Sequence, residues 1–279
     1  MLLQAQAMPR GHHRGISRKQ YEGRIVSYKK NIELYGDSIG KVEYVDHMGT
    51  DRTIVNSARV SFGKHVDELG DKDKKLINFL VNPPDGKMHT SVFEHCSVTF
   101  RFKVPLFIRS QHHRHRTWSY NEISRRYTDF NIEFYEPEAF RTQHKSNRQA
   151  SNAEELINPH IEEEKHRGDR DYIPAKASTL VAAHNTQSLI LFDKLIEAGV
   201  CREQARGVLP QNLYTEYYGT SSLLNLLKFC SLRLPKGAQW EIRQVAVAIV
   251  TILKDLYPVA LNAWISHLDE ELQDQFRSA

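Results

Sequence analysis

Residues 109–127, which read RSQHHRHRTWSYNEISRRY, carry an unusual concentration of cationic side chains. Five arginines and three histidines fall within these nineteen residues, interleaved with Trp118, Tyr120 and Tyr127. The only acid is Glu122, although a solvent-exposed helix normally offsets such charge with acids four residues away. So many neighbouring cations need anionic partners, and the planar fork of arginine matches phosphate oxygens in bidentate geometry. The segment therefore predicts a site for a phosphorylated ligand.

Composition alone leaves another interpretation of this segment open. A basic surface helix could bind RNA or nothing at all, and single-stranded nucleic-acid binders also interleave arginine with aromatic residues. A metal site built from His112, His113 and His115 is disfavoured, because three histidines so close in sequence cannot all face one ion from a regular helix. We expect no metal centre.

Hydrophobic periodicity predicts the elements that must position this segment. The clearest strand covers residues 96–103, where Val98, Phe100 and Phe102 alternate with polar residues. A shorter strand is expected around 42–45, and a helix begins at Leu106. Further helices are predicted over residues 51–62, 67–82, 175–198, 201–209, 220–232 and 239–267, the last interrupted near Pro258. Few strands among many helices, without a βαβ rhythm, indicate an α+β fold in a single domain.

The chain has 279 residues, 40% of them hydrophobic, which suits one globular domain. No apolar run approaches the roughly 20 residues needed to cross a bilayer, so we expect a soluble, cytoplasmic protein with no membrane partner. The net charge of +4 favours anionic ligands but does not separate a polynucleotide from a small phosphate ester. Cys96, Cys201 and Cys230 are too widely spaced for a zinc site or a disulfide framework, and we expect reduced thiols.

Two stretches are set apart from the rest of the domain, which we place at residues 41–270. Residues 1–40 are predicted to be an N-terminal extension, whose first 20 residues hold four basic residues and no acid. A transit peptide stays open for this stretch, but its poor amphipathic period favours a disordered or loosely docked extension. Residues 141–171 are polar with few aliphatic side chains, and are predicted to be an inserted surface excursion.

The order of residues within the cationic segment resembles the signature of the flavin-dependent thymidylate synthases. Arg114-His115-Arg116 is followed by seven residues and then by Ser124, with Ser119, Asn121 and Glu122 in the gap and Arg126-Tyr127 behind. Other stretches resemble the family in its order over roughly residues 42–257. These are residues 58–62 (ARVSF), His89 with 93–95 (FEH), Arg206 with 212–215 (NLYT), and Arg233 with 238–242 (AQWEI).

This resemblance implies a homotetramer of the family's own α+β fold, a mostly antiparallel sheet flanked by helices, with active sites shared between subunits. It implies reductive methylation of dUMP to dTMP. Methylenetetrahydrofolate would supply the carbon, and FAD reduced by NADPH would supply the hydride. Small-molecule substrates are therefore the expected partners, and nucleic acid is not. No cysteine lies in a matched motif, which agrees with chemistry that needs no cysteine nucleophile.

The resemblance also implies roles by position. The flavin positions are Ser61, Ser91, Arg114, His115, Arg116 and Glu122. The dUMP positions are Gln111, Ser124, Arg126, Tyr127, Arg206 and Arg233. Ser124 and Arg233 are the expected catalytic residues, Ser124 as a binding group and not a nucleophile, and Arg233 facing the uracil carbonyls. His89 would lie at the entrance for folate and NADPH, or is a polar residue satisfied in a loop.

Five positions depart from the family pattern. Ser110 stands where arginine is usual, with Arg109 one place earlier, so either a small shift restores the charge or a substrate contact is lost. The other four departures fall at flavin positions: Ser222, Leu224, Lys228 and Gly237. Lys228 is a candidate to replace a missing cation there. These departures leave open a relative that makes another 5-modified pyrimidine deoxynucleotide, or a non-catalytic relative that binds nucleic acid.

Overall fold

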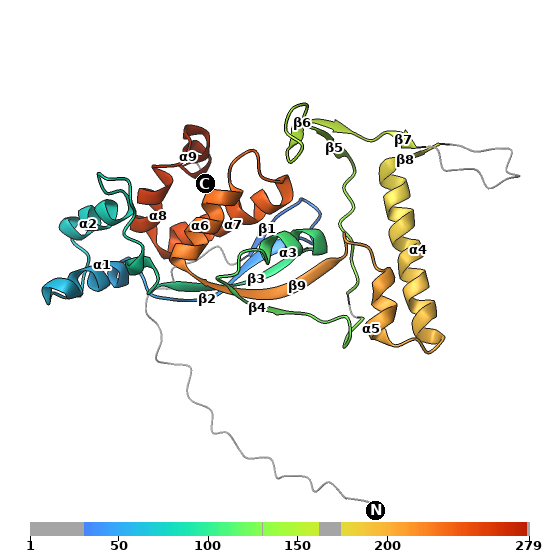
Figure 1. Cartoon of the computed structure of the whole chain (residues 1–279), viewed down its shortest axis with the longest axis horizontal. Coiled ribbons are helices and arrows are strands. Elements are labelled where there is room, and N and C mark those ends of the chain that lie inside the picture. The colour runs from blue at the N-terminus through green and yellow to red at the C-terminus, as the bar shows by residue number, and fades with distance from the viewer. Residues whose placement is uncertain (1–30, 130, 162–173, 278–279) are drawn as a thin grey trace, which may run out of the picture.

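The computed structural model describes residues 31–129, 131–161 and 174–277, and a five-stranded sheet forms its centre. Neighbouring strands in the order β1-β2-β3-β9-β4 are all antiparallel. The strands are β1 (Asn31–Glu33), β2 (Lys41–Met48), β3 (Ser97–Pro105), β9 (Tyr214–Ser222) and β4 (Ser119–Glu122). With helices gathered over one face of this sheet (Figure 1), the predicted α+β class is confirmed.

Strand β3 is the middle of the sheet and follows the predicted alternation. Val98, Phe100 and Phe102 are fully buried beneath the helices, whereas Arg101 and Lys103 point to the other face. Both cations form ion pairs there: Arg101 pairs with Glu43 of β2 and Glu216 of β9, and Lys103 pairs with Glu133. The strand prediction for residues 96–103 is therefore confirmed, with two more residues at its end.

Strand β9 is the largest error of the sequence prediction. A helix was expected over residues 220–232, but residues 214–222 pair with β3 and β4, and helix α6 occupies Leu223–Arg233. The tyrosines and threonines of β9 suit a pleated surface, and pairing on both sides decides the conformation. Ser222 then begins the helix, because its hydroxyl accepts a hydrogen bond from Asn225 N at 3.4 Å.

In the described part of the chain, seven helices form or border the main apolar core. Helices α3, α6 and α7 contact the sheet, α1, α2 and α8 pack at one end, and α9 closes the C-terminal side. The buried Asp51 joins α1 to α8 by accepting from Val259 N and Ala260 N at 2.9 and 3.0 Å. The bounds are α1 (Asp51–Arg59), α2 (Asp71–Val81), α3 (Leu106–His112), α7 (Trp240–Leu256), α8 (Pro258–Ile265) and α9 (Glu270–Arg277), with short turns η1 (Val60–Phe62) and η2 (Ser91–Phe93).

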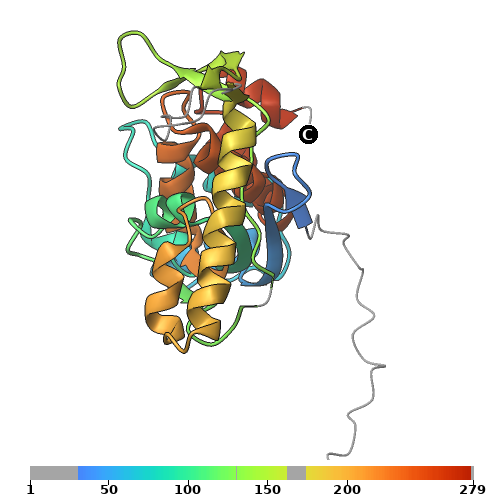
Figure 2. The ribbon, with the colours of Figure 1, turned by 90° about the vertical axis from the view of Figure 1, so that its right-hand side faces the viewer.

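The long helix α4 (Ala177–Glu197) stands beside the sheet with its own small core. It packs against α5 (Arg202–Ala205) and η3 (Arg206–Val208) through Phe192, Ala205 and Leu209. Figure 2 shows α4 and α5 side by side as an antiparallel pair. This pair fixes the segment that carries Arg206 relative to the sheet.

Several boundaries differ from the sequence prediction. Residues 141–161 are not irregular, because β5 (Phe140–Gln143) and β6 (Ser151–Ile157) form a hairpin, and β7 (His160–Ile161) pairs with β8 (Ala175–Lys176). Residues 162–171 of the predicted excursion lie outside the described residues. The sheet begins at β1, so residues 31–33 belong to it and residues 34–40 connect β1 to β2. Residues 1–30 of the predicted extension lie outside the described part. None of the described helices is long and apolar enough to cross a membrane.

Candidate active site

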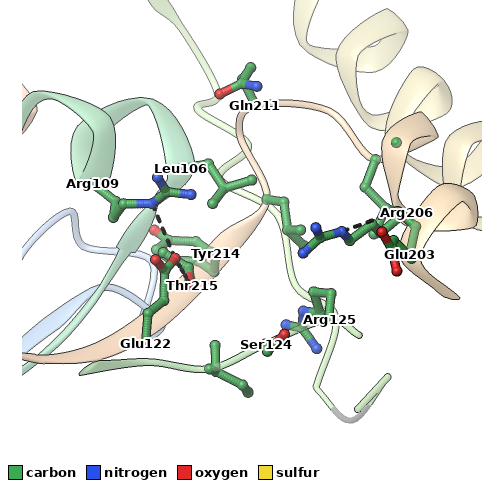
Figure 3. Close-up of a pocket in the computed structure, with 14 residues that line it drawn as sticks. Leu106, Arg109, Glu122, Ser124, Arg125, Glu203, Arg206, Gln211, Tyr214 and Thr215 are labelled. Carbon is green, nitrogen blue, oxygen red and sulfur yellow. Dashed lines mark hydrogen bonds and ion pairs between the residues drawn. The ribbon is translucent and has the colours of Figure 1, made fainter. Parts of the chain in front are cut away.

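A cavity of about 540 Å³ opens where the end of β4, the start of β9 and the α5–η3 segment meet (Figure 3). It mixes cationic and acidic side chains, and we call it the cationic cavity. Three arginines face two carboxylates, so the cavity has an excess of positive charge before any ligand binds. Its polar lining residues are Arg109, Glu122, Ser124, Arg125, Glu203, Arg206, Gln211, Tyr214 and Thr215.

Pairing at the sheet edge positions the Glu122 and Ser124 side chains. Glu122 is the last residue of β4, and the amide of Ile123 continues the ladder by donating to Glu216 O at 2.9 Å. The chain then turns, since Tyr127 N donates to Ser124 O at 2.9 Å. The Ser124 hydroxyl oxygen accepts from Arg126 N at 3.3 Å, so its own proton is available for donation into the cavity.

Two partners fix the Glu122 carboxylate. Arg109 Nε lies 3.1 Å from Glu122 Oε1, and the buried Thr215 hydroxyl donates to the same oxygen at 2.7 Å. The remaining cations on the cavity wall are differently engaged. Arg125 donates to Asn131 O at 3.1 Å, and Arg206 Nε donates to Glu203 O at 3.4 Å. The acceptor of Arg206 is a neutral carbonyl, so an anion in the cavity would meet the charge of its guanidinium group.

The Arg114-His115-Arg116 tripeptide lies in the loop between α3 and β4. The loop follows His112, whose side chain is buried beneath it. His112 is fully buried against Phe102, Trp118 and Phe229, with ring centroids 4.6–4.9 Å away. Its Nδ1 lies 2.7 Å from the hydroxyl of Tyr217. Burial, reinforced by nearby cationic groups, holds the pKa of His112 well below its usual value, so the ring is neutral.

Tyr120 closes this loop from the strand side. Its hydroxyl lies 3.2 Å from His112 O and 3.1 Å from His115 O. The Arg114 and Arg116 side chains are left exposed, whereas His115 is half-buried and accepts a hydrogen bond from Arg233 Nε at 3.2 Å. Burial and the adjacent guanidinium lower the pKa of His115. We call residues 112–116 with Arg233 the histidine loop.

Comparison with known proteins identifies the family. The sequence profile described as thymidylate synthase complementing protein matches residues 43–259. The flavin-dependent thymidylate synthase of Thermus thermophilus is 44% identical over 231 residues, covering 83% of this chain and 77% of the relative. The enzyme of that name from Thermotoga neapolitana is 37% identical, covering 82% and 92%. The chain belongs to the flavin-dependent thymidylate synthase family.

A solved structure agrees with this membership. The crystal structure of a UMP/dUMP methylase from Streptomyces cacaoi, bound with 5-bromo-dUMP, superposes with a TM-score of 0.65 at 30% identity. The match covers 84% of this chain and 97% of that one. The family resemblance inferred from the cationic segment is therefore confirmed, and so is the fold expected with it.

The structure brings together only part of the residues expected at dUMP in this family. Ser124 and Arg206 both line the cationic cavity. Arg126 and Tyr127 do not line it: both are exposed, and the Arg126 guanidinium lies 5.6 Å from the centre of the Tyr127 ring. Gln111 and Arg233 are also absent from its lining. The amide oxygen of Gln111 is buried without a hydrogen-bond partner in the described part of the chain.

The residues expected at flavin divide into three places. Glu122 lines the cationic cavity, and Arg114, His115 and Arg116 belong to the histidine loop. Ser61 and Ser91 are exposed on η1 and η2. The turn η2 contacts helix α6, and the histidine loop contacts the same helix through Phe229 and Arg233. His89 is exposed as well, with its ring 5.5 Å from that of Phe79.

The structure places all five of the family departures. Arg109 lines the cationic cavity while Ser110 is exposed, so the displaced arginine does bring its charge to this site. Leu224 is buried in the core, and Ser222 caps α6. Lys228 is exposed on α6 and Gly237 has open space around its α-carbon.

Sequence reasoning missed four residues of the cavity. Arg125 could have been found, because it lies between two residues of the family signature. Glu203 carries no local signal, since the folding of α5 toward β4 brings it in. Thr215 lies inside the matched 212–215 motif, but no role was assigned to it. Gln211 was likewise passed over, although it directly precedes the 212–215 motif.

Proposed function

We propose that this chain methylates dUMP to dTMP and that the nucleotide phosphate binds in the cationic cavity. The observation that carries the proposal is the convergence of Ser124, Arg125 and Arg206 on one cavity. A hydroxyl donor beside guanidinium groups suits a phosphate dianion. The family membership and the methylase bound with 5-bromo-dUMP support a pyrimidine nucleotide as the ligand.

We propose that the remaining dUMP-binding positions complete the site from a neighbouring subunit of a homotetramer. The support is that Gln111, Arg126, Tyr127 and Arg233 do not line the cationic cavity of their own chain. In this assembly Arg233 would face the uracil carbonyls and stabilise the negative charge that develops when C5 is activated. Tyr127, which is 78% exposed, would have its ring available to stack on a base.

The chemistry assigned to this site needs no protein nucleophile. None of the three cysteines lines the cationic cavity, and burial raises the pKa of Cys96 to about 12 and that of Cys230 further. A neutral buried thiol is a poor nucleophile. Ser124 has no adjacent base and is assigned to binding. The absence of any disulfide among these cysteines supports a cytoplasmic location.

We propose FAD as the cofactor, held by Ser61, Ser91, Arg114, Arg116 and Glu122. His115 is the sixth flavin position that the resemblance implies, but its hydrogen bond with Arg233 supports a different role. The exposed guanidinium groups of Arg114 and Arg116 fit the pyrophosphate of a dinucleotide, which supports this donor set. When bound, reduced flavin would supply the hydride that completes the methyl group. We further propose NADPH as the reductant and methylenetetrahydrofolate as the carbon donor, with His89 at their entrance; the support here is family resemblance.

The decisive experiment is turnover by the purified protein. With FAD, NADPH and methylenetetrahydrofolate, dUMP should lose its C5 proton and gain a methyl group made from the folate methylene and one hydride. Mass spectrometry should identify the product as dTMP by a net gain of one CH2. UMP is the second substrate to offer, because the neighbouring structure is named as a UMP/dUMP methylase. A hydroxymethylated product would favour the alternative that the chain makes another modified pyrimidine. Salt-sensitive binding of a polynucleotide without turnover would favour the nucleic-acid-binding alternative.

A further inference from the structure

The hydrogen bond between Arg233 and His115 has a fixed direction. A guanidinium is always protonated, so Arg233 Nε can only donate, and His115 Nε2 at 3.2 Å must accept with its lone pair. The single ring proton of His115 is therefore on Nδ1. Within the described ranges, no ion pair or hydrogen bond engages the two terminal nitrogens of Arg233. The hydrogen bond thus uses the Nε donor of Arg233 and leaves its two terminal guanidinium nitrogens available to a ligand.

His115 is itself held on both sides, so it is a fixed acceptor. Its ring meets Phe229 edge-on at 4.8 Å, and its carbonyl receives the Tyr120 hydroxyl at 3.1 Å. Phe229 is fully buried and lies one helical turn before Arg233 on α6. The imidazole and the arginine stem are therefore anchored to the same helix end. Without this anchoring, the long arginine side chain would be ordered only when its ligand binds, and the lost rotamer entropy would weaken binding.

Cations surround His115 more than acids do. Arg233 faces it from α6, the neutral His112 ring of α3 lies 6.4 Å away, Tyr120 approaches from β4, and Arg114 and Arg116 flank it in the chain. Protonation would place two like charges in contact and remove the acceptor that orients Arg233. Burial acts in the same direction, and the pKa of the ring is lowered.

We infer that His115 is a positioning residue for Arg233, whose guanidinium it orients by accepting the Nε proton so that the terminal nitrogens can bind a carbonyl oxygen of the pyrimidine. This inference rests on the proposed function, and it differs from the flavin contact that resemblance implies for His115. A positioning role acts on the nucleotide step, whereas a flavin contact acts on cofactor affinity. The two roles can therefore be separated by measurement.

The test compares His115→Phe, which keeps a ring on Phe229 but offers no acceptor, with His115→Gln, whose amide oxygen can accept. For H115F we expect kcat/KM for dUMP to fall by about 10- to 100-fold, the usual effect of losing a hydrogen bond to a charged group. FAD affinity, titrated by the flavin spectrum, should stay within about 3-fold. H115Q should recover most of the loss, and H267F, at an exposed histidine after α8, should change neither quantity.

Loss of FAD binding in H115F with an unchanged dUMP step per bound flavin would overturn the inference. So would equal impairment of H115Q and H115F. A double-mutant cycle with R233K adds an independent criterion, because lysine lacks the Nε donor. The effects of H115F and R233K should be strongly non-additive, and simple addition contradicts the pairing.

Nitrogen NMR of the full-length wild-type protein tests the pair without turnover, and it covers the case in which H115F does not fold. The His115 ring, assigned as the signal lost in H115Q, should be the Nδ1-protonated tautomer at neutral pH. It should protonate only below the ordinary histidine pKa. An Nε2-protonated or cationic ring would refute the inference. If instead the wild type makes no dTMP while the ring shows the expected tautomer, the proposed function fails and the Arg233–His115 contact stands.

Discussion

The cationic cavity and the histidine loop lie at opposite ends of the short strand β4, and both are built around arginine. In the cavity, carboxylates accompany the cations: Arg109 pairs with Glu122, and Glu203 lies beside Arg206. In the loop, no ion pair engages Arg114, Arg116 or Arg233 anywhere in the ranges that the structure describes. The nearest titratable neighbours there are histidines, and burial keeps those histidines neutral.

This difference shows two ways of keeping an anion site stable before its ligand arrives. Acids in the cavity reduce the repulsion between guanidiniums and also orient them. The loop instead avoids adding charge, because its three histidines all have lowered pKa values and stay uncharged beside the arginines. We therefore expect the cationic cavity, which contains acids, to discriminate more strongly between anions. The histidine loop, which lacks acids, should become more ordered when an anion binds to it.

The largest effect should follow from Arg206→Ala. This change removes a guanidinium from the cationic cavity, and the phosphate of dUMP would lose a charge-assisted hydrogen bond. We expect kcat/KM for dUMP to fall about 100-fold, mainly through KM, with FAD content unchanged. Steady-state kinetics measure it. The matched control is R202A on α5, whose arginine pairs with Asp129 outside the cavity; an equal loss in both variants would show that the cavity is not the phosphate site.

The next largest effect should be on protein stability, through the buried His112 of the histidine loop. His112→Phe leaves the Tyr217 hydroxyl without its buried partner, and we expect the free energy of unfolding to fall by about 2 kcal/mol. The pKa of His112 is lowered in the folded state, so its contribution to stability is complete above about pH 6.5 and is lost as the pH falls below that value. Denaturant titrations at pH 7.5 and 5 should show a smaller pH dependence in H112F. An unchanged dependence would mean that His112 is charged in the fold.

A smaller effect should follow from Thr215→Val in the cavity. Valine keeps the shape but removes the hydroxyl that donates to Glu122, so the carboxylate loses one of its two anchors. We expect about a 5-fold loss in kcat/KM for dUMP. The neighbouring β9 variant T220V, whose hydroxyl pairs with Thr99 away from the cavity, serves as the control. If T215V behaves like T220V, the acids of the cavity do not order its cations.

The smallest effect should be that of Lys228→Ala. This lysine is a candidate to replace a missing family cation at flavin, but its side chain is exposed on α6. Exposed charges contribute little, so we expect FAD affinity to weaken by no more than about 5-fold. Fluorescence titration of FAD measures this. A loss of 50-fold would place flavin directly on this face of α6, and identical affinity would exclude Lys228 as a replacement cation.

The sequence was most informative where one segment carries both periodicity and chemistry. Strand β3 could be predicted because its alternation is local, and the Arg-His-Arg signature located the histidine loop and Ser124 together. Strand β9 could not be predicted, because Tyr217 is paired on both sides by strands more than 90 residues away. Tertiary folding also creates the cavity: Glu203 of α5 has no motif of its own and escaped prediction, whereas Arg206 was found by its motif.

The hairpin β5–β6 shows a second limit. Residues 141–157 read as polar loop, yet Arg141 of β5 forms an ion pair with Glu241, which is buried at the start of α7 and also accepts from Tyr135 at 3.2 Å. A tertiary ion pair with several hydrogen bonds therefore anchors a segment whose own periodicity is weak. Polarity alone did not distinguish a solvated loop from a hairpin held by a buried carboxylate.

A crystal structure of the protein with dUMP and FAD tests the central claim most directly. The account predicts that the nucleotide phosphate lies in the cationic cavity, within hydrogen-bond distance of the Ser124 hydroxyl and the Arg206 guanidinium, with the pyrimidine reached by Arg233 of a neighbouring subunit. A nucleotide bound elsewhere, with Ser124 and Arg206 facing only water, would contradict it.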